Sequence, residues 1–253
     1  MSISAAILFR EALAGVAKLE ATQMEPIRKA GELLADSILR DGVIQVFGTG
    51  HSRAFAMEMA SRAGGLVPVN AMDMEALFLT GAIPLSLRHS PALERDPETA
   101  HKVLAHYNIH PADAFVLVSN SGRNGSTVEM ALEVKRRGHP LIVVTSMEHS
   151  SQVTSRHPSG KRLFEVADVV IDNCGPYGDA LLPLEGKPYK VCAVSSITGA
   201  FIAQGLTAEI IGRMLQAGVE PPVLISANVD GGDAHNEALR RKYAGRIPTG
   251  VGA

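Results

Sequence analysis

The stretch Val118-Ser119-Asn120-Ser121-Gly122-Arg123-Asn124-Gly125-Ser126-Thr127 is among the most informative parts of this sequence. It follows the apolar run 115–117, which is typical of a buried strand, and precedes a helical pattern that stops at Gly138 before Pro140. Glycine lets the backbone turn sharply and approach a ligand closely. A helix start offers unpaired N–H groups and the positive end of the helix dipole to an anion. The stretch therefore predicts a strand, an anion-binding loop and a helix in succession.

A second stretch repeats this order. Phe47-Gly48-Thr49-Gly50-His51-Ser52 follows the apolar run 43–46 and precedes another helix start. Hydroxyl groups cluster in both loops, where they add hydrogen bonds without adding charge. Because both loops follow strands of one expected sheet, we expect them to form a pocket for a small phosphorylated molecule. The competing interpretation is that these serines only cap helices, as Ser and Thr often do.

Runs of Val, Ile and Leu without alternation indicate a parallel sheet that is covered on both faces. The expected fold class is therefore α/β, a doubly wound parallel sheet with additional N-terminal helices. We expect one domain, with a helical extension at 1–40, a core at 41–218 and a C-terminal segment at 219–253, and with irregular connections at 71–113 and 173–190. Strands are expected at 43–47, 66–69, 114–118, 141–145 and 169–172, and helices at 5–19, 26–38, 98–107, 127–137 and 191–215.

Composition narrows the function classes. The chain has 253 residues, of which 46% are hydrophobic, so it can bury a full core. Its 24 basic and 26 acidic residues give a net charge of −2, and it has no Trp, which together argue against a nucleic-acid partner. Cys174 and Cys192 have neither metal-site spacing nor a dense disulfide pattern, which favours a reducing cytoplasm. We see no signal peptide and no membrane-length apolar run, so we expect no membrane partner.

The first loop also partly matches the dinucleotide-binding fingerprint G-x-G-x-x-G. Gly48 and Gly50 supply the first two glycines, but Arg53 stands where the third belongs, and that glycine permits close packing of helix on strand. Asp73 lies at about the distance expected of the acid that binds the ribose. A nicotinamide cofactor would leave the second serine loop unexplained, so we favour a site without one.

Three motifs together resemble the SIS (sugar isomerase) domain family. They are Gly48-Thr49-Gly50-His51-Ser52 after the first strand, Ser119-Asn120-Ser121-Gly122 after the third, and Val194-Ser195-Ser196-Ile197-Thr198 in the long helix. The resemblance covers roughly residues 31–218, and the segment 222–236 is similar to a phosphosugar-binding branch near the phosphoheptose isomerases. It implies a sheet of five parallel strands, a phosphosugar site at their carboxyl ends, and dimers or tetramers that share sites between subunits.

The resemblance also implies a phosphate site built from the two loops. Ser119 and Ser121 match the family's phosphate-binding serines, and Ser52 matches the hydroxyl of its first loop. Asn124 stands where relatives have Ser or Thr, so that contact comes from its amide or shifts to the hydroxyls that follow. The expected phosphate-binding residues are Ser52, Ser119, Ser121, Asn124, Ser126 and Thr127, with loop backbone from Gly48, Gly50 and Gly122.

Aldose–ketose isomerisation needs a base to move a proton between neighbouring carbons and an acid or base for the hydroxyl proton. In phosphoheptose isomerases, a glutamate after the first loop and a histidine in the long helix fill these roles. Glu58 matches the glutamate once its helix is shortened by about a turn; alternatively it is an ordinary glutamate paired with Arg62. Serines occupy the place of the histidine, which leaves His235 as the candidate, or as an ordinary residue at a helix start. His51, inside the first loop, is a third candidate.

These patterns lead us to expect a cytoplasmic sugar-phosphate isomerase that uses neither a metal nor a nicotinamide cofactor. The remaining histidines have no spacing typical of a metal site. Two alternatives are a non-catalytic phosphosugar sensor or regulatory subunit, and an etherase or deaminase acting on an amino-sugar phosphate. The expected helix at 191–215 is apolar over most of its circumference, which predicts a homo-oligomer, most simply a two-fold dimer.

Overall fold

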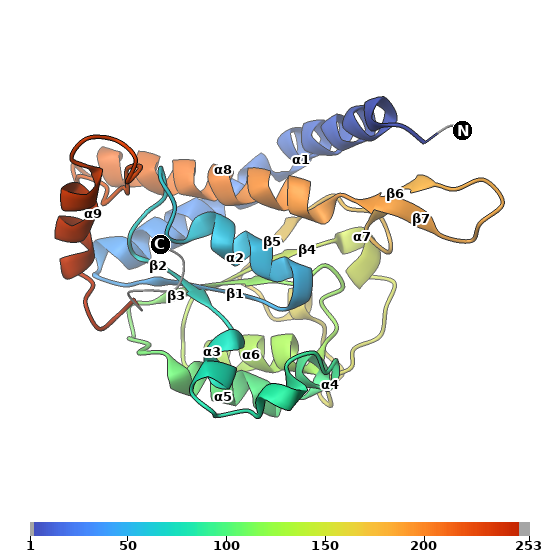
Figure 1. The fold of residues 1–253 in the computed structure, drawn as a ribbon, viewed down its shortest axis with the longest axis horizontal. Coiled ribbons are helices and arrows are strands. Elements are labelled where there is room, and N and C mark those ends of the chain that lie inside the picture. The colour runs from blue at the N-terminus through green and yellow to red at the C-terminus, as the bar shows by residue number, and fades with distance from the viewer. Residues whose placement is uncertain (1–2, 248–253) are drawn as a thin grey trace.

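The structure is a computed structural model that describes residues 3–247, and its centre is a sheet of five parallel strands between two helical layers (Figure 1). The sheet confirms the expected fold class. Its order is β2-β1-β3-β4-β5, so the chain runs outward from β1 to β2, crosses back to β3, and continues to the other edge. The strands are β1 (Ile44–Gly48), β2 (Val69–Met72), β3 (Ala114–Val118), β4 (Leu141–Thr145) and β5 (Val169–Asp172).

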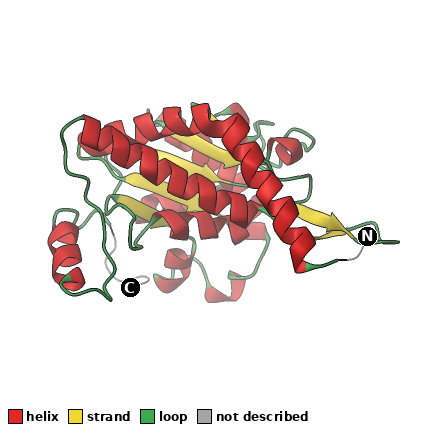
Figure 2. Ribbon diagram, turned by 90° about the horizontal axis from the view of Figure 1, so that it is seen from above, coloured by secondary structure: helices red, strands yellow, loops and turns green. Residues whose placement is uncertain are grey.

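The strands are apolar throughout because both faces of the sheet are covered. Successive side chains of a strand point to opposite faces, and in β3 Val116 belongs to one core cluster while its neighbours Phe115 and Leu117 belong to the other. Figure 2 shows two long helices lying over one face, α1 and α8. The first face is covered by α1 (Ala5–Leu39), α2 (Arg53–Met59) and α8 (Ser195–Gln216), and the second by α3 (Glu75–Leu79), α4 (Ala92–Arg95), α5 (Glu98–His106) and α6 (Gly125–Arg136).

The N-terminal region is one continuous helix rather than the two expected. Pro26 lies inside α1, although proline removes a backbone hydrogen bond. Leu19 and Ile27, on either side of the proline, enter the same core cluster as Leu206 of α8. Packing against α8 therefore stabilises the helix across the point where the local sequence predicts a break.

Two further elements differ from the expectation. The second strand starts at Val69 rather than at Leu66, because Leu66 forms an isolated antiparallel bridge with Val223 of the C-terminal segment. The stretch 173–190, expected to be irregular, contributes β6 (Ala180–Pro183), which pairs with β7 (Lys190–Ala193) as an antiparallel hairpin. This hairpin projects beyond the sheet beside the start of α1 (Figure 1). Consequently α8 begins at Ser195, after the hairpin, rather than at 191.

The remaining helices are short or peripheral. They are α7 (Met147–Ser150), α9 (Gly232–Arg241) and the 3₁₀ turns η1 (Gly50–Ser52), η2 (Leu85–Leu87) and η3 (Leu163–Glu165). The end of the sheet that lies toward α9 is the end where the strands begin, because residues 64–67, just before β2, bond to the segment leading to α9. Within residues 3–247, no helix has the length and apolar character needed to cross a membrane.

Candidate functional site

A cavity of about 130 Å³ lies at the carboxyl ends of the strands, between the first loop, α2 and the start of α8. The strand order reverses between β1 and β3, and in doubly wound sheets the ligand crevice forms outside the carboxyl ends at such a point. The cavity wall combines apolar groups with polar side chains that can bond a ligand: His51, described below, and six others. The six others are Ser52, Glu58, Asn120, Asn173, Ser195 and Ser196.

The first loop turns as its glycines require. Gly50 has a φ of 55°, and a methyl group on Gly48 would lie 2.7 Å from the carbonyl oxygen of Ser52. The turn places both Ser52 and His51 in the cavity wall. Arg53, which occupies the third glycine position of a dinucleotide fingerprint, points away to form an ion pair with Asp73, Nε to Oδ2 at 2.5 Å.

The second loop is fixed by its own serine. The Ser119 hydroxyl accepts a hydrogen bond from the Gly122 amide at 3.2 Å, so it holds the turn in which Gly122 has a φ of 59°. Asn120 reaches the cavity, and its side-chain oxygen accepts from the Asn173 amide at 2.9 Å. The Ser121 side chain is half-buried and forms no hydrogen bond with another residue of the described range 3–247. Its hydroxyl therefore remains available.

Of the expected phosphate-binding side chains, Ser52 is in the cavity wall, whereas Ser119 and Ser121 belong to the loop beside it and are not part of the wall. The last three lie under α4. Asn124 donates to the Glu94 carboxylate at 3.2 Å, and the Ser126 hydroxyl donates to the Glu94 carbonyl at 2.8 Å. Thr127 is fully buried. A methyl group on Gly125 would overlap the carbonyl oxygen of Arg95, so only glycine lets α4 approach the start of α6 this closely.

Glu58 lies in the cavity wall and is also paired with Arg62. Its Oε1 accepts from the Gln204 amide at 2.7 Å and forms a close ion pair with Arg62, one helical turn on. The Glu58 side chain keeps 26% of its surface exposed. The carboxylate is thus oriented by α2 and α8 while one side remains open to a ligand.

His235 lies far from Glu58 within one chain. It is on α9, and its Nε2 is 2.9 Å from the carbonyl oxygen of Val223. Figure 1 shows α9 at the end of the molecule opposite the β6–β7 hairpin. His51 is the histidine that the structure brings into the cavity with Glu58.

The sequence did not single out three polar residues that organise this site. Asn120 and Asn173 meet across the cavity, and Asp179 accepts from both the amide (2.8 Å) and the hydroxyl (2.7 Å) of Ser195. Asp179 therefore caps the start of α8 and orients a hydroxyl of the wall. A signal was present, since Asn173 directly follows β5 and polar residues at carboxyl strand ends are typical of ligand sites in such sheets.

Within the described residues 3–247, no group of three or more His, Cys, Asp or Glu side chains is arranged to hold a metal ion. The site's chemistry rests on hydroxyls, amides, backbone N–H groups, one carboxylate and the imidazole of His51.

Comparisons with known proteins place this chain in a family. Among similar proteins, a UPF0309 protein of Listeria monocytogenes is 44% identical over 230 residues, 91% of this chain and 93% of that protein. Another from Caldanaerobacter subterraneus is 41% identical over 236 residues, covering 92% and 94%. Among solved structures, a phosphoheptose isomerase from Francisella tularensis has a TM-score of 0.54 and 15% identity, covering 80% of this chain and 94% of that one.

The same fold recurs in a phosphoheptose isomerase from Neisseria gonorrhoeae, with a TM-score of 0.51, 18% identity, and coverage of 82% and 96%. At these identities the likeness concerns the fold alone. The profile of the SIS domain matches residues 9–146, more than half of the chain, and this range contains both glycine loops. The chain therefore belongs to the SIS domain family.

Proposed function

We propose that this protein binds a sugar phosphate in the cavity and interconverts its aldose and ketose forms, as a phosphoheptose-isomerase-like enzyme. The observation that carries this proposal is that Glu58 and Ser52 share one cavity wall with the second loop, represented there by Asn120. A carboxylate beside an anion-binding loop supplies a base next to the place where a phosphate would be held. The fold shared with phosphoheptose isomerases supports the same reaction class.

In this proposal the two loops bind the phosphate. Ser52 and Ser121 donate hydroxyl hydrogen bonds, Ser119 keeps the loop in shape, and Gly48, Gly50 and Gly122 allow the backbone to approach the anion. Asn124, Ser126 and Thr127 would join only after α4 moves off the start of α6, because Glu94 engages two of them.

Glu58 would act as the base that moves the proton between C1 and C2. A second group must handle the hydroxyl proton, and the chain offers two candidates. His51 lies in the same cavity wall. His235 would have to come from a neighbouring subunit, because α9 lies at the other end of the sheet. The proposed mechanism needs neither metal nor nicotinamide, and we place it in the cytoplasm.

We further propose that the chain forms a homo-oligomer, a dimer or tetramer. Apolar side chains on α1 and α8 remain exposed, among them Phe9 (64%), Leu13 (66%) and Phe201 (55%). An apolar cavity of about 340 Å³ lies between these two helices. A second copy would cover this surface. Sedimentation equilibrium that gave a monomer at micromolar concentration would contradict the proposal.

A non-catalytic sensor is the second candidate function, because the carboxylate of Glu58 is already engaged by Arg62 and Gln204. A thermal-shift screen against sugar phosphates would first identify stabilising ligands. Each would then be incubated with the protein in deuterated water and followed by NMR. Exchange of the C1 or C2 proton supports the isomerase, whereas tight binding without exchange across a broad panel supports the sensor.

A mixing experiment distinguishes the two acid–base candidates. Oligomers made of Glu58→Gln and His235→Asn subunits should regain part of the activity if His235 serves a neighbouring site. If His235→Asn alone keeps the wild-type activity, His235 is not required and His51 is the remaining candidate.

A further inference from the structure

Three arginines surround the turn at residues 123–125, at the start of α6. Arg123 is in the turn itself, and its carbonyl oxygen accepts from the backbone amide of Arg156 at 2.8 Å. The Arg156 guanidinium then donates to the side-chain oxygen of Asn124 at 2.9 Å. Arg95 is the last residue of α4, whose carbonyl packs on Gly125. Residues from three segments thus meet at one turn, and the charges of Arg123 and Arg95 act on the Arg156 guanidinium.

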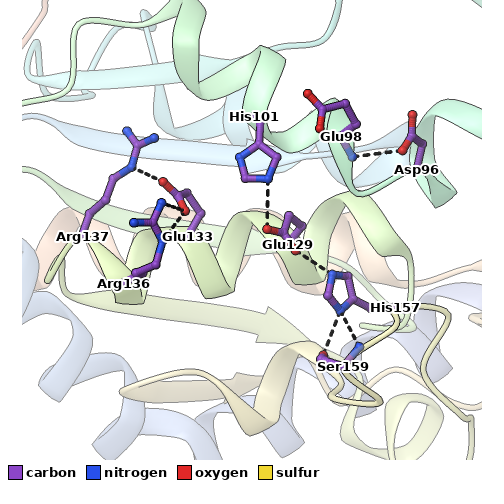
Figure 3. A network of polar contacts seen from close by, with 9 residues as sticks. All are labelled: Asp96, Glu98, His101, Glu129, Glu133, Arg136, Arg137, His157 and Ser159. Carbon is purple, nitrogen blue, oxygen red and sulfur yellow. Dashed lines mark hydrogen bonds and ion pairs between the residues drawn. The ribbon is translucent and has the colours of Figure 1, made fainter.

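The loop that carries Arg156 is anchored to α6 by a polar contact. His157, the next residue, lies 2.7 Å (Nε2 to Oε2) from Glu129 of α6, and the other oxygen of Glu129 is 3.1 Å from His101 of α5 (Figure 3). The Nδ1 of His157 is 2.8 Å from the hydroxyl of Ser159. Arg156 is therefore attached to an anchored backbone rather than to a free loop.

The positive charge of this cluster is only partly balanced. The ion pairs found between described residues include none formed by Arg95, Arg123 or Arg156. Partial burial, followed by repulsion from Arg123 and Arg95, lowers the pKa of Arg156, and Glu94 is the carboxylate that opposes this shift. Two arginines and one carboxylate thus act on Arg156, beside a helix start that itself favours an anion.

Buried polar atoms around the same turn are also without partners. The Nε of Arg123, the hydroxyl of Thr127 and the Nδ1 of His149 are each buried with no hydrogen-bond partner in the described structure. His149 is on α7, where its ring packs on Tyr177 at 4.7 Å between centroids. Leaving buried polar groups unpaired is costly, and a ligand that pairs with them is one physical reason to retain them.

The cluster adjoins the proposed sugar-phosphate cavity. Asn120 of the cavity wall and Arg123 belong to the same loop. On the other side, His149 interacts electrostatically with Asp179, which fixes Ser195 in that wall. A ligand held in the cavity can therefore extend along the loop toward the arginines.

We propose that Arg123, Arg156 and Arg95 form a second anionic subsite, so that the ligand of this protein is a sugar phosphate bearing a further anionic group. The proposal rests on the function proposed above and narrows its substrate class. The second group is a phosphate or a carboxylate, since guanidinium groups bind both. Its chemistry selects sugar bisphosphates and phosphorylated sugar acids over sugars with a single phosphate.

The test compares fructose 6-phosphate with fructose 1,6-bisphosphate and 6-phosphogluconate, by calorimetry on the full-length chain at low ionic strength. The wild type should bind the two doubly anionic probes more tightly, on the order of tenfold or more. Arg123→Gln should remove this preference while leaving the affinity for fructose 6-phosphate nearly unchanged. Arg123→Lys, which keeps the charge but not the guanidinium, should retain part of it. If Arg123→Gln loses more affinity for fructose 1,6-bisphosphate than for 6-phosphogluconate, phosphate is the preferred second group. The reverse order identifies carboxylate.

Lys161→Gln is the matched control, because it removes one exposed positive charge from the same loop as Arg156 without touching the cluster. It should leave all three affinities unchanged. Equal weakening of all probes by Arg123→Gln, or an equal effect of Lys161→Gln, would overturn the second subsite and leave the sugar-phosphate site standing. If no sugar phosphate bound to the wild type, both the subsite and the proposed function would fall.

Discussion

Replacing Glu58 by glutamine should abolish turnover and leave both the fold and ligand binding nearly intact. Glutamine has the shape of glutamate, and its side-chain oxygen can still accept the hydrogen bond that Gln204 donates at 2.7 Å. The phosphate is held by the serine loops, which the change does not touch. What disappears is the negative charge and the ability to take a proton from the substrate.

The expected loss of stability in Glu58→Gln is much smaller than the expected loss of catalytic rate. The lost ion pair joins a glutamate that is 26% exposed to Arg62, which is 46% exposed, at the i,i+4 spacing. Such partly exposed pairs contribute about 0.3–1 kcal/mol, which for a chain of this size lowers the melting temperature by roughly 1–4 °C. Loss of general base catalysis removes ~10²–10⁴-fold in rate, or about 3–5 kcal/mol of transition-state stabilisation. The catalytic loss should therefore far exceed the loss of stability.

The assay is exchange of the substrate's C1 or C2 proton with deuterated water, together with thermal melting with and without ligand. Glu237→Gln is a suitable control, because Glu237 forms an exposed i,i+4 pair with Arg241 at 3.2 Å on α9, outside the cavity wall. Wild-type exchange rates in Glu58→Gln would refute its role as the base. A fall in melting temperature well beyond that of the control would show that Glu58 is needed for the fold instead.

Three further predictions concern the second loop and the helices beside it. Ser121→Ala should weaken sugar-phosphate binding by roughly 1 kcal/mol or more, because a hydroxyl partner of a charged group is lost; unchanged affinity in calorimetry, or failure of inorganic phosphate to compete, would contradict this. Gly125→Ala should lower the free energy of unfolding by about 1–3 kcal/mol, because the added methyl group overlaps the carbonyl oxygen of Arg95; an unchanged urea midpoint would count against that packing. His149→Gln should reduce the loss of stability between pH 7 and pH 5, because burial, followed by repulsion from Arg123, lowers the pKa of His149. As the pH falls, the unfolded chain, with a histidine pKa of about 6.5, takes up the proton before the folded chain does, so the wild type loses stability. Urea titrations in which the two proteins lost stability in parallel would show the histidine to be irrelevant.

The sequence predicted the central sheet well because a parallel strand covered on both faces must be apolar at every position. Four of the five strands lie within a residue of the expected ranges, as β3 does at Ala114–Val118. The second strand was misplaced because Leu66 and Val67 are apolar for another reason. Both lie in a segment that bonds to residues near Val223, a partner more than 150 positions away that no local pattern reveals.

The site was predictable to the extent that it depends on strand ends. Ser52 and Glu58 lie in the cavity because the loop and helix after β1 begin at the carboxyl edge of the sheet. Which hydroxyls remain available depends on tertiary contacts, since Ser126 is engaged by Glu94 from an element about 30 residues upstream. The same limit applies to Asp179, whose role at α8 depends on a hairpin that the sequence did not predict.

The continuous α1 helix has a consequence for how the chain is made. α1 ends at Leu39, and α8, against which it packs, begins only at Ser195. At a synthesis rate of about 5–20 residues per second, roughly 150 residues of delay correspond to on the order of ten to thirty seconds. During that interval the apolar stripe of α1, including Leu19, Ile27 and Leu34, has left the ribosome before its main partner exists. The nascent chain thus exposes this apolar stripe without its main partner, and α1 becomes stable as one continuous helix only when α8 emerges.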